Sequence, residues 1–415
     1  MKIGKLILYT ISFPYGEKSE AFLENEIEIL SKNCDKLIII PLKKESNYLR
    51  KIPKNVEVNN IIINREVYSG KKILLRYLIT FLKIYFLSLF ESKKNFNFYI
   101  KNLRKYSSIL IGELELFHHL KNEFGNKYNS KKNIIYNYWF DQFLLSNCLL
   151  KKKYNLKLIT RAHGFDLYDE RNNNKPANFR KFKTNNCDLI FCVSNHGNNY
   201  LKSKTNKKNC QKIFTSYLGV NSNFNLQLDS YFNLNKKNKY PLIISIGSLI
   251  PLKRTDLIAK ALLLYEEKIK WVHFGDGLER KKIESICNTF NPNINYELKG
   301  HVSNKILTDY LKENKVDLLV STSEFEGLPV SMMEAISFGI PILACDVYGV
   351  KEIVVPEKTG ILMNKNINPL ELKNYIELAL KRNFKANSIL NFFEKNFNNK
   401  TNYERFINKI LKELF

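Results

Sequence analysis

Short apolar runs alternate with amphipathic stretches through the second half of the chain. Unbroken runs of Ile, Leu and Val are typical of strands buried on both faces, and apolar residues at every third or fourth position are typical of the helices that cover them. The expected strands are 242–247, 271–275, 294–300, 316–322 and 341–346, and the expected helices are 257–268, 279–290, 305–314, 328–338 and 370–381. Ser303 is the expected N-cap of the third helix. This alternation predicts a parallel, Rossmann-like sheet.

The first half opens with the same pattern. Residues 5–10 and 36–42 are predicted as strands on either side of a helix at 21–32. Further buried strands are expected at 133–139, 156–164, 188–194 and 212–220. Between about residues 65 and 130 the pattern becomes helical and basic, which predicts a helical insertion on this domain.

The length of the chain favours two domains. A single core rarely grows past about 250 to 300 residues, and this chain has 415. The polar stretch 221–239 has few large apolar residues and suits a linker. The predicted organisation is a first domain at 1–220 with its insertion at about 65–130, a linker at 221–240, a second domain at 241–385 and C-terminal helices at 386–415.

Charge and composition exclude some classes of protein. The chain has 66 Lys and Arg against 40 Asp and Glu, a formal charge of +26, together with 44% hydrophobic residues. It is therefore neither an acidic solvating protein nor broadly disordered. Because AT-rich codons favour its abundant Lys, Asn, Ile, Tyr and Phe, basicity is weak evidence for any one ligand. It is compatible with a membrane surface, nucleotides, lipid diphosphates or nucleic acid.

The longest apolar stretch, 73–90, contains Arg76 and Lys83 and so lacks the roughly 18 uncharged residues of a spanning helix. Lys72, Arg76 and Lys83 are spaced to share one stripe of a helix whose other faces are apolar. Such a helix, at 72–90, could lie on anionic lipid. An ordinary core helix with a solvated basic edge fits equally well.

Two further features concern the cellular compartment. Seven cysteines are spread singly, without the paired spacing of a zinc or redox site, which favours reduced thiols in the cytoplasm. The first residues are strand-like and lack a small-residue cleavage site, so we do not expect export.

Two carboxylates stand out where an expected strand ends. Glu326 lies in the loop after 316–322, and Glu334 lies in the following helix. The first could accept hydrogen bonds from sugar hydroxyls and the second from both hydroxyls of a ribose. Gly327 leaves the loop backbone accessible, and Pro329 suits a first helical turn. By spacing alone, such a pair is more often solvated helix charge.

The stretch 324–354 resembles the E-x7-E signature of family 4 retaining glycosyltransferases of the GT-B fold. That fold is α/β, with two Rossmann-like parallel-sheet domains facing across a cleft. The stretch 246–262 resembles the loop in which the family binds the donor diphosphate, with Lys253 at the family's lysine. Ser248 stands where many members have arginine, and Arg254 is a neighbouring basic residue.

Two more βα units, 274–284 and 299–311, match the family, and the second implies a nucleobase pocket near His301 and Val302. In the first half, 161–171 resembles the family's histidine-glycine loop, which places His163 beside the donor sugar, with Arg161 and Asp166 as secondary candidates. The resemblance thus implies His163, Glu326 and Lys253 as catalytic residues, and as donor-binding residues Gly16, Ser248, Lys253, Arg254, His301, Val302, Glu326, Gly327, Leu328, Pro329, Val330 and Glu334.

The glycine expected to approach the donor from the first domain is Gly16, where many members have two adjacent glycines. The resemblance is strongest over 242–362 and weakest over 50–130, where acceptor specificity usually lies.

The implied reaction is transfer of a sugar from a nucleoside diphosphate sugar to a hydroxyl, of hexosyltransferase type, with retention and without a metal or other cofactor. We favour front-face departure and attack, because no nucleophile is assigned. The expected acceptor is a lipid-linked glycan of surface polysaccharide synthesis (lipopolysaccharide, capsule or exopolysaccharide), reached from the inner face of the cell membrane by a cytoplasmic, peripheral enzyme. A soluble acceptor stays open.

Other functions compete with this one. An epimerase or a phosphorylase could share the fold, but the E-x7-E loop disfavours the first and the lack of a pyridoxal phosphate lysine site disfavours the second. A basic nucleic-acid-binding protein would need arginine interleaved with aromatic residues, whereas the charge here is mostly scattered lysine. An inactive GT-B scaffold is disfavoured by the presence of both Glu326 and Glu334.

Overall fold

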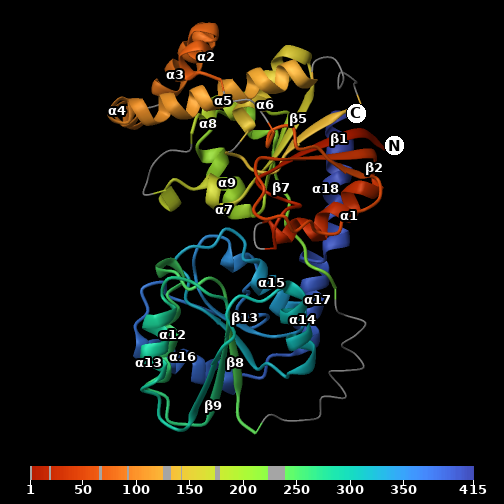
Figure 1. Ribbon diagram of the computed structural model, residues 1–415. Coiled ribbons are helices and arrows are strands. Elements are labelled where there is room, and N and C mark those ends of the chain that lie inside the picture. Colours follow the sequence, from red (N-terminus) through yellow and green to blue (C-terminus); the bar gives the residue numbers. More distant parts are fainter. Residues whose placement is uncertain are drawn as a thin grey trace. The chain divides into compact units, whose positions relative to one another are not determined.

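The computed structural model describes residues 2–17, 20–64, 68–90, 93–124, 132–141, 143–172, 178–222 and 239–415. The chain divides into two compact units. The first comprises Met1–Tyr217 and Tyr403–Phe415, and the second comprises Leu218–Asn402. Each unit contains its own parallel sheet (Figure 1). The predicted fold class, α/β with two Rossmann-like parallel sheets, is confirmed.

The sheet of the first unit has the order β3-β2-β1-β4-β5-β6-β7. Every pairing in it is parallel, and most strand residues are buried, as the unbroken apolar runs predicted. Its strands are β1 (Ile3–Thr10), β2 (Cys34–Pro41), β3 (Val56–Val58), β4 (Ile134–Asn137), β5 (Lys157–Ala162), β6 (Leu189–Cys192) and β7 (Ile213–Thr215). The short edge strand β3 was not predicted.

The helices that connect these strands bury their apolar sides against the sheet. Ile27 and Leu30 of the helix at Glu24–Lys32 join Leu6, Leu37 and other strand residues in one core cluster. The connecting helices are α1 (Glu24–Lys32), α6 (Leu144–Tyr154), α7 (Gly164–Leu167), α8 (Arg180–Asn186), α9 (Asn195–Ser203) and α10 (Lys207–Cys210).

Four helices fill most of the stretch predicted as an insertion: α2 (Gly70–Arg76), α3 (Leu78–Leu89), α4 (Lys93–Lys101) and α5 (Leu103–Phe124). Figure 1 shows α2 and α3 beyond α5, on the side away from the sheet. The single helix expected at 72–90 is wrong, because α2 ends at Arg76 and the next residue, Tyr77, has a φ of −116° and a ψ of 23°, which are not helical. The Tyr77 hydroxyl lies 2.8 Å from Nδ1 of His118 on α5, which anchors the break.

The sheet of the second unit has the order β10-β9-β8-β11-β12-β13, again with parallel pairings. Ser303 caps α14 as predicted, because its hydroxyl accepts a hydrogen bond from the backbone N–H of Ile306. The strands are β8 (Leu242–Ile246), β9 (Ile269–Phe274), β10 (Ile294–Leu298), β11 (Leu318–Ser321), β12 (Ile342–Cys345) and β13 (Gly360–Met363). The helices are α12 (Thr255–Leu262), α13 (Arg280–Cys287), α14 (Asn304–Glu313), α15 (Val330–Ile336), α16 (Pro369–Lys381) and α17 (Ala386–Asn396).

Two helices occupy the stretch 386–415, as the sequence predicts, but they belong to different units. Helix α17 belongs to the second unit, whereas α18 (Asn399–Leu414) enters the first unit at Tyr403. Phe406, Ile407 and Ile410 of α18 lie in the core cluster of the first unit. The chain therefore passes between the units twice. Of the predicted linker 221–240, residues 223–238 lie outside the described residues.

Candidate functional site

Two loops meet at the carboxyl edge of the second sheet, where the adjacent strands β8 and β11 end. The loop after β8 forms a short 3-10 turn, η4 (Pro251–Lys253), and the loop after β11 carries Glu326. The Lys253 ammonium pairs with the Glu326 carboxylate, and both side chains are partly exposed, at 25% and 13%. The structure thus brings together two residues that are 73 positions apart in sequence.

Arg254 holds these two loops together. It adopts a left-handed conformation with φ of 48°, and its Nε donates to the Thr322 carbonyl at 2.8 Å. Nη2 contacts the Cys345 sulfur at 3.3 Å, and Nη1 lies 3.7 Å from Glu324. All three guanidinium nitrogens are used within the unit. Arg254 therefore has a structural role in joining the loops, and its expected contact with the donor stays a prediction.

Glycines let the neighbouring loops pack closely at the same edge. A Cβ on Gly275, after β9, would overlap the carbonyl oxygen of Gly247, after β8. The Gly275 N–H donates to the Gly300 carbonyl at 2.8 Å, which brings the loop after β10 alongside. Ser248 and His301 are exposed on this edge. Because parallel strands end there and helices begin there, such an edge is the usual place for a ligand.

Glu334 lies on α15, which begins at Val330 with Pro329 as its N-cap. The side-chain amide of Asn304, on α14, donates to the Glu334 carboxylate. Burial raises the pKa of Glu334 to about 7, although the bond from Asn304 lowers it. Glu334 is therefore divided between its charged and neutral forms near neutral pH.

In the first unit, His163 directly follows β5 and is the N-cap of α7. Its ring lies against Trp139 at 4.5 Å and Tyr138 at 5.0 Å between centroids. Burial, together with the charge of Arg161, holds the pKa of His163 well below its usual range, so the ring is neutral. Neither ring nitrogen meets a side-chain partner. The backbone N–H of Asp166 faces the ring in a capping box, which leaves at most one ring nitrogen for a ligand hydroxyl.

Asp166 fixes the backbone of this histidine loop. Its two carboxylate oxygens accept the N–H groups of His163 at 2.7 Å and Phe140 at 2.6 Å. Burial raises the pKa of Asp166 to about 8, against the lowering effect of both bonds. The position of Asp166 makes it a positioning residue rather than a substrate contact.

Sequence reasoning missed Glu20, which is buried and left-handed with φ of 55°. One oxygen accepts the N–H of Ile11 at 2.9 Å and Nε1 of Trp139 at 2.6 Å, and the other accepts the N–H groups of Ser12 and Phe13, each at 2.8 Å. Glu20 thus orders the loop after β1 and the indole against His163. In sequence it resembles the solvated acids of the helix at 21–32, so no local signal marked it.

Two other predicted residues lie in the interior of the first unit. Arg161 is fully buried and paired with Glu26 at 3.3 Å, so it is a core residue. Gly16 is buried with φ of 83°, and its N–H donates to the Tyr48 carbonyl at 2.9 Å. Glu45 fills the space where a Cβ would stand, so packing within the unit is enough to require glycine at this position.

All seven cysteines are free thiols. Within the described ranges, no group of three or more His, Cys, Asp or Glu side chains is arranged to hold a metal ion.

Comparison with known proteins identifies the class of this chain. Residues 229–395 match the family model described as "Glycosyl transferases group 1". This chain is a glycosyltransferase of the GT-B fold. The glycosyltransferase is 29% identical, over 75% of its length, to an uncharacterized glycosyltransferase of Methanocaldococcus jannaschii, 86% of which is covered. Both halves of the enzyme therefore have a counterpart in one relative.

Other similarities to the glycosyltransferase are more local or more distant. It is 33% identical over 36% of its length to a poly(ribitol-phosphate) alpha-N-acetylglucosaminyltransferase of Staphylococcus aureus, of which it spans 31%. Its fold matches Anabaena HepE in complex with UDP (TM-score 0.64, 14% identity, 99% of this chain and 100% of that chain). It also matches a lipopolysaccharide outer core galactosyltransferase (TM-score 0.67, 14% identity, 99% of both chains). At this identity the two structures show the fold alone.

Proposed function

We propose that this glycosyltransferase moves a sugar from a nucleoside diphosphate sugar to a hydroxyl of a glycan acceptor, with retention at the anomeric carbon. The observation that carries the proposal is the Lys253–Glu326 pair at the carboxyl edge of β8 and β11. A lysine there can bind a diphosphate, and a carboxylate beside it can accept sugar hydroxyls. The complex of HepE with UDP supports a nucleotide donor.

In the proposed reaction, the bond between the anomeric carbon and the diphosphate oxygen breaks while the acceptor oxygen bonds to the same face of that carbon. The acceptor proton passes to the departing phosphate. Lys253 and the loop amides would stabilise the negative charge that develops on the leaving group. His163, being neutral, would contribute a hydrogen bond to a sugar hydroxyl rather than a charge. We propose that no metal is required, and undiminished activity in EDTA is the corresponding test.

Nucleotide binding is the direct test of the donor site. We expect one of UDP, GDP, ADP or CMP, or its sugar conjugate, to raise the melting temperature selectively, because a ligand of the native state stabilises it by mass action. Lys253→Ala and Glu334→Ala should remove this shift. Lys305→Ala is the control, because Lys305 is exposed and pairs only with exposed Asp309. An equal shift in all three variants would contradict the assigned donor site.

Binding should also depend on pH. The ribose hydroxyls are best accepted by the ionised Glu334, whose pKa is about 7. Raising the pH from 6 to 8 should therefore strengthen binding of the nucleoside diphosphate sugar up to about tenfold. The sugar conjugate is the right probe because its phosphates do not titrate in this range. Glu334→Gln should show no such increase, and a parallel increase in that variant would assign the titration elsewhere.

For the acceptor, we propose a lipid-linked glycan of surface polysaccharide synthesis, reached at the cytoplasmic face of the membrane. The support is that each of α2, α3 and α4 has exposed apolar side chains, among them Leu75, Ile79 and Ile100 at 76%, 70% and 51% exposed. From Tyr68 to Gly112 the sequence has nine lysines and arginines and one acid, Glu91. Apolar side chains among basic ones are complementary to anionic lipid. None of the described helices is long and apolar enough to cross a membrane.

Vesicle sedimentation tests this membrane contact. The enzyme should bind vesicles of anionic phosphatidylglycerol more than vesicles of phosphatidylcholine, and Ile79→Glu or Phe86→Glu should weaken binding at least fivefold. Leu278→Glu is the matched control, because Leu278 is 93% exposed in the second unit. An equal loss of vesicle binding in all three variants, or equal binding to anionic and neutral vesicles, would contradict the proposal.

A further inference from the structure

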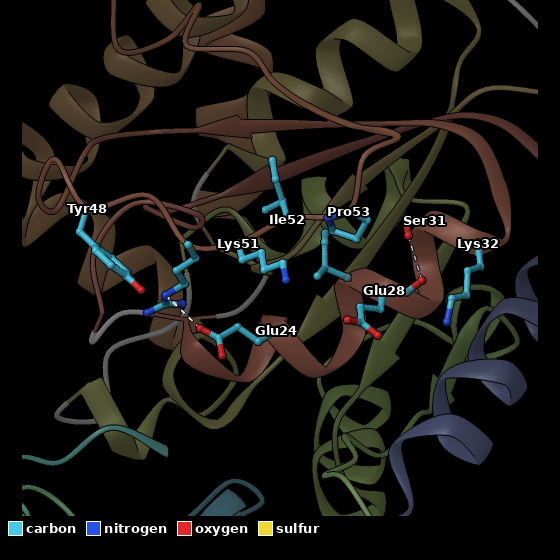
Figure 2. Close-up of a pocket in the computed structure, with 10 residues that line it drawn as sticks. Glu24, Glu28, Ser31, Lys32, Tyr48, Lys51, Ile52 and Pro53 are labelled. Atoms are coloured by element: carbon cyan, nitrogen blue, oxygen red, sulfur yellow. Dashed lines mark hydrogen bonds and ion pairs between the residues drawn. The ribbon is translucent and has the colours of Figure 1, made fainter. Parts of the chain in front are cut away.

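The first unit has a pocket beside helix α1. It has a volume of about 580 Å³ and runs along α1, beside the segment that precedes β3. This size is within the usual range of small-molecule sites. Figure 2 shows Glu24, Glu28 and Lys32 along the helix, with Tyr48 near one end. The lining residues are Glu24, Ile27, Glu28, Ser31, Lys32, Tyr48, Arg50, Lys51, Ile52 and Pro53.

Arg50 is the unusual member of this lining. It is only 4% exposed, its backbone N–H donates to the Pro14 carbonyl at 3.0 Å, and its guanidinium lies 5.6 Å from the centroid of the Phe13 ring. Nε is 3.2 Å from Glu24, but Nη1 and Nη2 have no hydrogen-bond partner. Buried donors are nearly always satisfied, and the planar edge of a guanidinium matches a carboxylate or a phosphate. An anionic ligand would fill this gap.

Charged side chains around Arg50 have both signs. Lys32 and Lys51 add positive charge to the pocket, and Glu24 and Glu28 oppose it. Glu24 is 51% exposed and contacts only Nε, so its side chain is free to turn toward solvent. Both Nη atoms are shielded from solvent, so binding of an anion to them requires a side chain to move, and Glu24 is the mobile neighbour. The single contact between Nε and Glu24 would then be exchanged for two contacts, from Nη1 and Nη2 to the anion.

The rest of the pocket suits a sugar ring. Tyr48 is 53% exposed, and Ile52 and Pro53 give an apolar side. Aromatic and apolar surfaces pack against the C–H face of a pyranose, while the carboxylates of Glu24 and Glu28 can accept its hydroxyls. We propose that this pocket binds an anionic sugar, a uronate or a sugar phosphate, through Arg50 and Tyr48. That this sugar belongs to the acceptor glycan rests on the proposed function.

Calorimetric titration of the full chain tests the pocket without any donor. The probes are methyl glucuronide, glucose 6-phosphate, neutral methyl glucoside and inorganic phosphate. Both charged sugars should bind at least tenfold more tightly than methyl glucoside, and Arg50→Gln should remove that preference. Tyr48→Ala, at an exposed side chain, should weaken the binding of glucose 6-phosphate and leave the affinity for inorganic phosphate unchanged. Lys36→Gln, an exposed lysine of the same unit, is the charge control.

Several outcomes would overturn this proposal. They are equal affinity for methyl glucoside and methyl glucuronide, an unchanged preference in Arg50→Gln, or inorganic phosphate binding as tightly as glucose 6-phosphate. If Arg50→Gln folds poorly, Arg50→Lys takes its place. This variant keeps the charge and loses the planar edge, so its preference for the charged sugars should be intermediate. The nucleotide-induced melting shift is measured in each variant. If the nucleotide still raises the melting temperature normally but no anionic sugar binds, the proposal for the pocket is wrong and the assignment of the donor site is unaffected.

Discussion

Replacing Glu326 with glutamine should lower kcat/KM for sugar transfer by at least about a hundredfold, because two hydrogen bonds to a charged group, each worth about 1.5–3 kcal/mol, are weakened together. The first is the proposed bond from the donor sugar. The second is the pairing with Lys253, which the structure shows and which orients the ammonium. Initial rates with the nucleotide sugar that shifts the melting temperature would measure the loss.

The matched control for Glu326→Gln is Glu324→Gln, two positions earlier in the same loop. Glu324 is 55% exposed and its carboxylate is 3.7 Å from Arg254. Exposed ion pairs of this kind contribute little free energy, so kcat/KM of Glu324→Gln should stay within about twofold of that of the unmodified enzyme. If the two variants lost activity equally, the effect would belong to the loop and not to the carboxylate of Glu326.

The largest expected loss of stability comes from Arg161→Met, which should reduce the free energy of unfolding of the first unit by about 3–5 kcal/mol. Arg161 pairs with Glu26, and both are fully buried. Arg161 also donates to the Tyr136 hydroxyl at 2.8 Å and the Ser216 carbonyl at 3.2 Å. Removing it leaves Glu26 buried without its cation. The double variant Arg161→Met, Glu26→Gln should be more stable than Arg161→Met alone.

The effect of pH checks the cause. Burial already raises the pKa of Glu26, and losing Arg161 removes a charge that lowers it. A carboxyl whose pKa is higher in the folded than in the unfolded state stabilises the fold at low pH and loses that contribution as pH rises. Arg161→Met should therefore cost less at pH 5 than at pH 8. A cost independent of pH would mean that packing, not the charge of Glu26, dominates.

The chain has two tryptophans, Trp139 in the first unit and Trp271 in the second, which allows the units to be followed separately. In a Trp271→Phe background, urea unfolding followed by fluorescence reports on the first unit. Lys36→Met is the control, since Lys36 and its partner Glu57 are exposed by 46% and 49%. Its cost should stay below about 1 kcal/mol.

Much of the fold could be predicted because its signals are local. The apolar runs that became β8, β9, β11 and β12 and the cap at Ser303 depend on neighbours in sequence, since period and capping act within a turn or a strand. The same holds for Glu326 and Glu334, which were placed through a motif that also lies within one loop and helix.

Other assignments required the tertiary structure. The partners of Arg161 and Arg254 within the chain, Glu26 and Thr322, lie 135 and 68 positions away, so no local pattern reveals them. Glu20 looked like a solvated acid until the loop after β1 and Trp139 closed around it. The Tyr77 hydroxyl, at the break between α2 and α3, contacts His118, which lies 41 positions away on another helix.

Local patterns predict the two parallel α/β sheets and the position of the loop with Glu326, because strand burial and helix periodicity are properties of each segment. Two features are visible only in the folded chain: α18 returns to the first unit, and Arg50 lines a pocket with two of its nitrogens unpaired. Each of these depends on which distant segments meet. An isolated lysine, arginine or glutamate has no periodicity that reveals its partner.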